Sequence, residues 1–161
     1  MDRFVSTFTN RIDSKGRVSV PASFRAVLAR DGFEGVYAYP ALGVAAIDAG
    51  GHRLVEEING LLDRLPAYSD ERDQLAAALY GDSEILKLDG EGRVALPERL
   101  LDCAGIGERV SFVGLGHKFQ LWEPDRFAAH QSEARTKVRE LKQLLSGMPP
   151  AGGGRSSGVT E

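Results

Sequence analysis

The sequence predicts an α+β fold in which two copies of one small β-unit pack together about an approximate two-fold axis, with helices outside. Two observations predict it. The stretch from Ile12 to Pro21 recurs from Leu88 to Pro97, 76 positions later, with Asp, Gly, Arg, Val and Pro in register. Between and after the copies, apolar residues recur at helical spacing. Two copies are too few for a solenoid, which needs at least three repeats.

Each copy has the pattern of a strand, a tight turn and a second strand. Residues 18–20 alternate with period two, as a half-buried strand does. The turns are Asp-Ser-Lys-Gly and Asp-Gly-Glu-Gly, where Gly16 and Gly92 can adopt the positive φ that a hairpin turn requires. Pro21 and Pro97 cannot donate to a sheet, so each strand is expected to end there and a short helix to follow.

An Asp and an Arg lie on the two arms of each turn: Asp13 and Arg17 in the first copy, Asp89 and Arg93 in the second. Such a pair can form a charge-assisted hydrogen bond worth roughly 1.5–3 kcal/mol when partly shielded. One interpretation is that the pair only staples the turn. The other is that the Asp orients an Arg whose planar fork meets an external partner, because that fork suits phosphate oxygens and guanine edges.

The first unit begins with a strand predicted over residues 4–12, which leads into the first turn. Phe4, Phe8 and Ile12 are expected on one side of this strand and Arg11 on the other. Further strands are predicted at residues 36–39 and 44–47. The unit is followed by a helix predicted over residues 52–65, and by a second helix that starts at a Ser69 cap and ends near Gly81.

The second unit repeats this order, with a strand at 83–88, the second turn, a short helix to Ala104, and strands at 109–114 and 118–122. A last helix starts at Pro124, and its apolar residues recur at steps of three and four, which predicts packing on a helix of this or another subunit. Beyond Gly147 the Gly-, Pro- and Ser-rich chain predicts a disordered tail. The predicted divisions are 1–50 (first unit), 51–81 (helical insertion), 82–124 (second unit), 125–146 (C-terminal helix) and 147–161 (tail).

The composition is that of a globular protein, with 42% hydrophobic and 27% charged residues. The sequence has neither an apolar run of membrane-spanning length nor a signal-peptide core, so we expect a cytoplasmic protein with no membrane partner. Its net charge is −3, yet residues 1–30 contain six basic and two acidic residues, which gives +4 there and −7 elsewhere. This asymmetry indicates a localised anion-binding face.

Patterns typical of catalysis or metal binding are missing from the sequence. The three histidines are scattered, residues 114–118 lack the spacing of a phosphate-binding loop, and neither a nucleophile elbow nor an HExxH pattern occurs. We therefore expect no enzyme activity, cofactor, metal or small-molecule substrate. Cys103 lies in an apolar segment and is expected to be buried.

The two Asp-x-x-x-Arg turns, together with Lys-Phe-Gln-Leu-Trp at 118–122, resemble the MraZ family of bacterial transcriptional regulators, within the AbrB/MazE group. The resemblance covers the chain from Met1 to about Leu145. It implies two AbrB-like units that form an interleaved (double-split, swapped-hairpin) β-barrel with peripheral helices, assembled into a homo-oligomeric ring. It also implies a nucleoid-associated repressor of its own division and cell-wall operon, which binds short direct repeats of double-stranded DNA in the promoter.

The family's Asp-x-x-x-Arg residues map onto Asp13 and Arg17, and onto Asp89 and Arg93. In this interpretation the arginines contact bases or phosphates, the aspartates orient them, and Arg11 and Lys15 anchor phosphates.

A ring that aligns many such modules makes repeated sites bind far more tightly than single ones. Because Glu91 replaces Lys15 in the second copy, we predict that Arg17→Ala weakens DNA binding more than Arg93→Ala. Two alternatives remain open: an antitoxin-like protein-binding module of the same fold, and a structural ring that does not bind DNA.

Overall fold

The fold is described from a computed structural model, which places residues 2–147. The tail predicted beyond Gly147 lies outside these described residues. The chain divides after Pro124, so the β-rich part and the C-terminal helix are described separately.

The two β-units contain the same elements in the same order. The first consists of β1 (Thr7–Arg11), β2 (Arg17–Ser19), α1 (Ala22–Asp31), β3 (Val36–Pro40) and β4 (Ile47–Gly50). The second consists of β5 (Glu84–Leu86), β6 (Arg93–Ala95), α4 (Glu98–Ala104), β7 (Arg109–Gly114) and β8 (Phe119–Trp122). Between them lie α2 (His52–Leu62), α3 (Asp70–Ala76) and the π-helical turn η1 (Ala77–Gly81).

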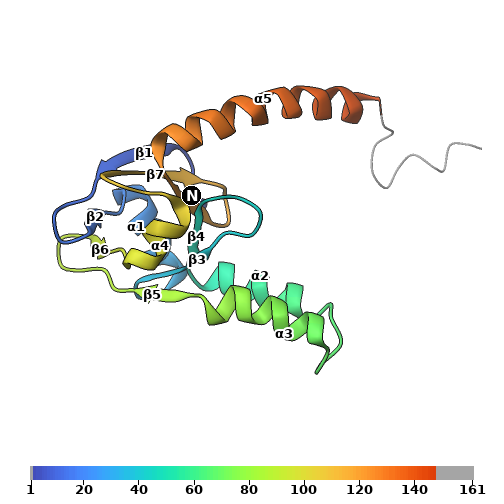
Figure 1. Ribbon diagram of the computed structural model, residues 1–161, viewed down its shortest axis with the longest axis horizontal. Helices are drawn as coiled ribbons and strands as arrows, with labels where there is room; N and C mark the ends of the chain where they lie inside the picture. Colours follow the sequence, from blue (N-terminus) through green and yellow to red (C-terminus); the bar gives the residue numbers. More distant parts are fainter. Residues whose placement is uncertain (1, 148–161) are drawn as a thin grey trace, which may run out of the picture. The chain divides into compact units, whose positions relative to one another are not determined.

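Six strands form one antiparallel sheet in the order β1-β7-β8-β4-β3-β5, and β2 and β6 form a separate two-stranded ribbon (Figure 1). The counterparts in this sheet are β1 and β5, β3 and β7, and β4 and β8. Replacing each strand with its counterpart gives the same strand order read from the other edge. Strand β1 pairs with β7 and β3 with β5, whereas the β4–β8 and β2–β6 pairs join counterparts. Strands of the two units are therefore interleaved, as expected for copies related by a two-fold axis.

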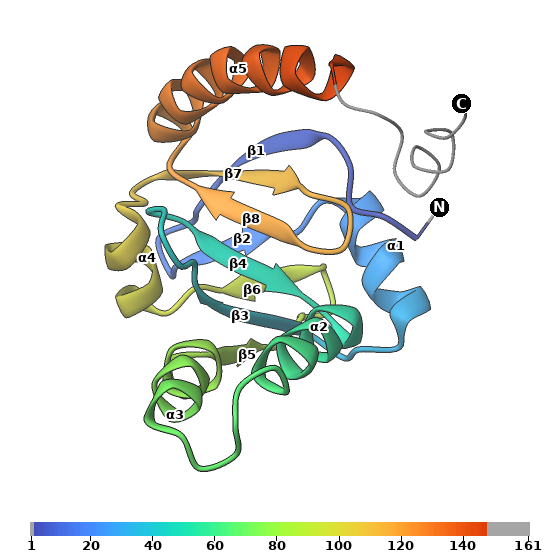
Figure 2. The ribbon, with the colours of Figure 1, turned by 90° about the vertical axis from the view of Figure 1, so that its right-hand side faces the viewer.

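The α+β class with antiparallel sheets is confirmed, but the closed barrel implied by the resemblance is not. No sheet closes within residues 2–147, because β1 and β5 form the two edges of the six-stranded sheet and neither has a ladder to the ribbon. The ribbon strands have only three residues each and are followed closely by Pro21 and Pro97, which cannot donate to a ladder. Figure 2 shows the six-stranded sheet with the ribbon behind it.

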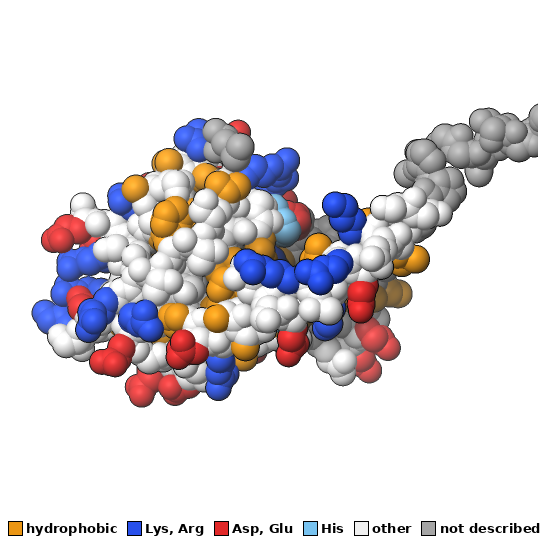
Figure 3. Space-filling model, turned by 90° about the horizontal axis from the view of Figure 1, so that it is seen from above, with side chains coloured by type: hydrophobic (Ala, Val, Ile, Leu, Met, Phe, Trp, Pro, Cys, Tyr) orange, Lys and Arg blue, Asp and Glu red, His pale blue; other side chains and the backbone are white. Residues whose placement is uncertain are grey.

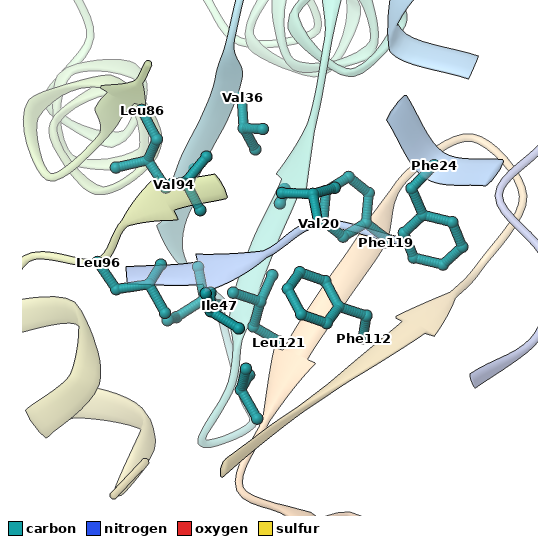
Figure 4. Packing of buried hydrophobic residues seen from close by; sticks show 14 of the residues in the cluster. Val20, Phe24, Val36, Ile47, Leu86, Val94, Leu96, Phe112, Phe119 and Leu121 are labelled. Atoms are coloured by element: carbon teal, nitrogen blue, oxygen red, sulfur yellow. The ribbon is translucent and has the colours of Figure 1, made fainter. Parts of the chain in front are cut away.

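One apolar core fills the space between the sheet and the ribbon (Figure 4). Val18 and Val94 are direct partners in the ribbon, and each is almost fully buried. Phe24 of α1 is fully buried, with its ring centroid 5.0 Å from that of Phe119 in β8. Burial of each such side chain stabilises the fold by about 1.5–3 kcal/mol. The ribbon is therefore held mainly by its inward-facing side chains.

A second, smaller cluster packs the inserted helices on β3. It comprises Tyr37, Tyr39, Leu54, Ile58, Leu62 and Leu79. The Ser69 cap is confirmed, because its hydroxyl accepts a hydrogen bond from the Arg72 N–H at 3.2 Å.

Two predicted strands differ from the structure. The strand predicted over residues 4–12 is interrupted at Ser6, whose φ is 75°, so that Phe4 forms only an isolated bridge to Gly116. The strand predicted at 44–47 is wrong, because β4 starts at Ile47 and includes Asp48. Asp48 is only 4% exposed. Its carboxylate tolerates burial because Lys118, just before β8, and Gln120 of β8 donate hydrogen bonds to its oxygens.

The prediction that Cys103 is buried is also wrong. Cys103 is exposed on α4, whereas Leu100 and Ala104 of the same helix face the core. Its thiol donates to the Leu100 carbonyl at 3.1 Å.

The C-terminal helix α5 (Pro124–Ser146) has no buried residue. Four large apolar residues of its second half are exposed: Val138, Leu141, Leu144 and Leu145. The packing partner predicted for this helix stays a prediction. Among the described residues, every helix is too short or too polar to span a membrane.

Candidate nucleic-acid interface

In the first turn, one carboxylate holds both arms together. Asp13 Oδ1 accepts hydrogen bonds from the backbone N–H of Lys15 at 2.9 Å and of Arg17 at 2.8 Å. Asp13 Oδ2 accepts a third from Arg17 Nε at 2.8 Å. Since Gly16 adopts a φ of 79°, the chain reverses without the strain that another residue would suffer. The guanidinium Nη groups of Arg17 have no hydrogen-bond partner within residues 2–147.

The second turn repeats this geometry. Asp89 Oδ1 accepts from the N–H of Glu91 at 2.8 Å and of Arg93 at 2.9 Å, and Oδ2 accepts from Arg93 Nε at 2.8 Å. One contact is added, because Arg93 Nη2 lies 3.6 Å from a Glu91 carboxylate oxygen. The stapling interpretation of the Asp–Arg pairs is therefore satisfied in both turns, and it leaves Nη donors available for a second role.

Hydrogen bonding also keeps both carboxylates ionised. The backbone N–H of Arg17 is the main cause that lowers the pKa of Asp13, and that of Arg93 lowers the pKa of Asp89 in the same way. The hydrogen bond to Asp89 raises the pKa of Arg93, and the charge of Asp13 adds to this effect.

The ribbon register places the two arginines on one face. Arg17 lies opposite Ala95, and Ser19 lies opposite Arg93. Directly opposed residues share a face of an antiparallel pair, as do alternate residues of one strand, so Arg17 and Arg93 both point outward while the valines between them face the core. Diagonal neighbours of this kind have Cα atoms about 7–8 Å apart. The side chains of Arg17 and Arg93 are 33% and 25% exposed.

The turns themselves lie at opposite ends of the ribbon, and each is tied to the other unit. The Leu96 N–H donates to the Gly16 carbonyl at 2.9 Å, and the Val20 N–H donates to the Gly92 carbonyl at 3.0 Å. These two bonds are equivalent under the repeat. The spacing between the arginines is therefore set by the packing of both units.

The other two residues predicted for the site lie close in sequence to the first turn. Lys15 is an exposed turn residue, and Arg11 ends β1 and is exposed. Directly opposite Arg11 in the ladder lies Arg109, the first residue of β7, which is also exposed. Sequence reasoning missed Arg109, because only the pairing of β1 with β7 brings it to Arg11.

Arg11 and Arg109 form a pair of like charges. Neither guanidinium has an ion-pair or hydrogen-bond partner in the described part of the chain. Like charges directly opposite in a ladder are destabilising, and an anion between them would remove that repulsion. Figure 3 shows several Lys and Arg side chains toward the left, the side on which β2 and β6 lie in Figure 1, interspersed with Asp and Glu.

Comparison with known proteins identifies the family. A family model described as "MraZ protein, putative antitoxin-like" matches residues 79–144. The chain is 62% identical over 151 residues to a transcriptional regulator MraZ of Beijerinckia indica subsp. indica, an alignment that covers 94% of this chain and 92% of that protein. The chain belongs to the MraZ family of transcriptional regulators. Proteins of the same name from Xanthobacter autotrophicus (58% over 145 residues, 90% and 92% coverage) and Methylocella silvestris (56% over 164 residues, complete coverage of both) are also similar.

The MraZ family model covers the second turn, and the alignment with the Beijerinckia relative is long enough to include both turns. The first turn lies outside the residues that the family model matches. Within residues 2–147, no cluster of three or more His, Cys, Asp or Glu side chains is placed to hold a metal.

The two turns of this MraZ chain differ in what surrounds them. Arg25 of α1 donates from Nε to the Val20 carbonyl at 3.0 Å, and its side chain lies over Gly92, where an added Cβ would be 2.7 Å from Arg25 Cζ. Around Gly16 the nearest atom to such a Cβ is the Leu96 carbonyl oxygen at 3.6 Å. The second turn is thus covered by an arginine, and the first is open.

Proposed function

We propose that this protein represses transcription of its own division and cell-wall operon by binding short direct repeats in the promoter through the outer face of the β2–β6 ribbon. One observation carries the proposal. Arg17 and Arg93 share that face, and each is held by its Asp through Nε alone, so that the Asp does not occupy the Nη donors.

The shape and chemistry of the ribbon suit duplex DNA. A two-stranded ribbon fits the major groove, which is about 12 Å wide, and Arg there bonds bidentately to guanine O6 and N7. Each arginine is already oriented by its Asp, so less side-chain freedom is lost on binding. Arg11, Lys15 and Arg109 would bind phosphates and set the register, because phosphate contacts position a protein without reading sequence.

Assembly explains how an acidic chain holds a polyanion. Each subunit supplies few contacts, but a homo-oligomeric ring with many ribbons on one side raises the effective concentration of every later contact. Such a ring would favour repeated sites over single ones and would associate with the nucleoid.

A gel-shift assay with the DNA just upstream of the protein's own gene tests the proposal. Wild type should shift this DNA, more strongly as salt falls. Arg17→Ala/Arg93→Ala should lower affinity roughly a hundredfold, since each lost base contact costs about 1–3 kcal/mol. Arg64→Ala is the matched control, because it removes an exposed arginine just after α2 and should leave affinity unchanged. No shift at low salt, or equal shifts by wild type and the double variant, would exclude this DNA-binding mode.

An antitoxin-like protein-binding module is the second candidate. It is favoured by the wording of the matched family description and by the exposed apolar residues of α5. Stoichiometric copurification with one small protein, together with no gel shift, would support it. A structural ring would give neither result.

A further inference from the structure

A cavity of about 830 Å³ opens between α1, the loop that follows it, and the edge strand β5. Its volume lies within the roughly 300–1,000 Å³ of typical small-molecule sites. The accessible apolar part of the lining includes Phe33, Ile85 and Leu88. Ile85 is 67% exposed although it belongs to a strand. The cavity thus offers apolar surface to a ligand at an unpaired sheet edge.

The charged part of the lining is mainly cationic. Arg25 and Lys87 line the cavity, and Glu34 is the single carboxylate of the lining. Arg25 uses its Nε on the Val20 carbonyl. No ion pair of Arg25 or Lys87 occurs within residues 2–147. Two cations without an ion pair, against one carboxylate, leave the lining with a net positive charge. A positive lining beside an apolar surface matches a molecule that is apolar at one end and anionic at the other.

We infer that this cavity binds a small amphipathic anion. Its apolar body lies against Phe33, Ile85 and Leu88, and its carboxylate, sulfonate or phosphate group meets Arg25 and Lys87. The inference goes beyond the proposed function, because no residue of the cavity belongs to the outer face of the ribbon.

The site is specific to one half of the molecule. The repeat places Leu101 at the position equivalent to Arg25, so the other half lacks this cation. Arg25 is also the side chain that lies over Gly92 in the second turn. A ligand in the cavity therefore contacts the same residue that covers the turn bearing Arg93.

Two fluorescent probes that differ by one charge test the inference on the full chain. 8-Anilinonaphthalene-1-sulfonate carries an anionic group, and N-phenyl-1-naphthylamine has the same aromatic body without it. Arg25→Gln/Lys87→Gln should weaken sulfonate-probe binding at least roughly tenfold and leave the neutral probe within about twofold. Ala29→Trp should weaken both probes, because Ala29 also lines the cavity and the larger side chain fills it.

The position of the probe is checked by methyl NMR. The Ile85 methyl signals should shift on addition of the sulfonate probe, whereas those of Ile58, which belongs to α2 and is buried in the smaller cluster, should not. Circular dichroism checks that each variant folds, and Ala29→Trp supplies an independent result if the double variant does not. Equal sulfonate-probe affinity in wild type and in a folded double variant would overturn the inference. The inference would also be overturned if Ala29→Trp changed the oligomeric state without weakening the binding of either probe. This face would then be a subunit contact. Since no DNA is present, either result leaves the proposed function untouched.

Discussion

The two turns have the same internal geometry and different surroundings. Each carboxylate accepts the same three hydrogen bonds, and the corresponding distances differ by no more than about 0.1 Å. The first turn carries Lys15 and is open around its glycine, whereas the second carries Glu91 and is covered by Arg25. The repeated residues therefore fix the backbone of a turn, and the residues that are not repeated set its charge and its cover.

The cover around the glycines predicts the most costly substitution in either turn. Both glycines have positive φ, so either Gly→Ala change should cost about 1–2 kcal/mol in strain. Gly92→Ala should cost about 1 kcal/mol more, because the new methyl displaces Arg25 and breaks its bond to Val20. Urea denaturation measures the free energies of unfolding. In an Arg25→Ala background the two glycine substitutions should cost the same, and equal costs in the wild-type background would contradict the role given to Arg25.

The charge difference predicts unequal DNA binding. Arg17→Ala should reduce operator affinity by about 2 kcal/mol, roughly thirtyfold, and Arg93→Ala by about 1 kcal/mol, roughly fivefold. The reason is that Glu91 already lies near Arg93 and opposes the approach of a phosphate. Gel shifts at one fixed salt concentration measure both losses. If the losses are equal, the ribbon is used symmetrically and Glu91 faces away from DNA.

A charge reversal sharpens the same comparison. Glu91→Lys gives the second turn the side chain of the first and should raise operator affinity modestly. If the new lysine contacts one phosphate, the slope of log K against log salt should become steeper by about 0.9 per binding subunit. Glu140→Lys on α5 is the matched control for net charge, since Glu140 is exposed outside the ribbon. Equal effects of the two substitutions would show only a general electrostatic attraction.

Acid should destabilise both turns equally, which is the smallest effect expected. The fold lowers the pKa of Asp13 and Asp89 below the ordinary value of 3.8. Their stabilising contribution is therefore complete above 3.8 and is lost as the pH falls through the lower folded values. The difference in unfolding free energy between wild type and either Asp→Asn variant should be full at pH 5 and smaller near pH 3. A larger difference in unfolding free energy at pH 3 than at pH 5 would show that folding raises, rather than lowers, the pKa of these aspartates.

Local sequence was sufficient for the features that depend on neighbouring residues. The turns follow from Asp, Gly and Arg within five positions, and the strand predicted at 109–114 matches β7 in full. The Ser69 cap and the first position of α5 are likewise local patterns.

Features that depend on distant partners were not predictable. Asp48 resembles a loop residue until Lys118 and Gln120, some seventy positions away, donate to it at 2.8 Å. Arg109 joins the candidate site only through its pairing with Arg11. The open sheet with a separate ribbon depends on which ladders form, and the periodicity of a single strand carries no information on that choice.

The palindromic strand order has a consequence for synthesis. Within the first unit alone, β3 and β4 form the only ladder in the described chain, and an isolated hairpin is marginal in water. Thr7 cannot reach Val113 until nearly the whole body has left the ribosome. The nascent chain must therefore wait, largely unfolded, for its second half, and a ribosome stalled after the helical insertion would hold a product unable to complete its sheet.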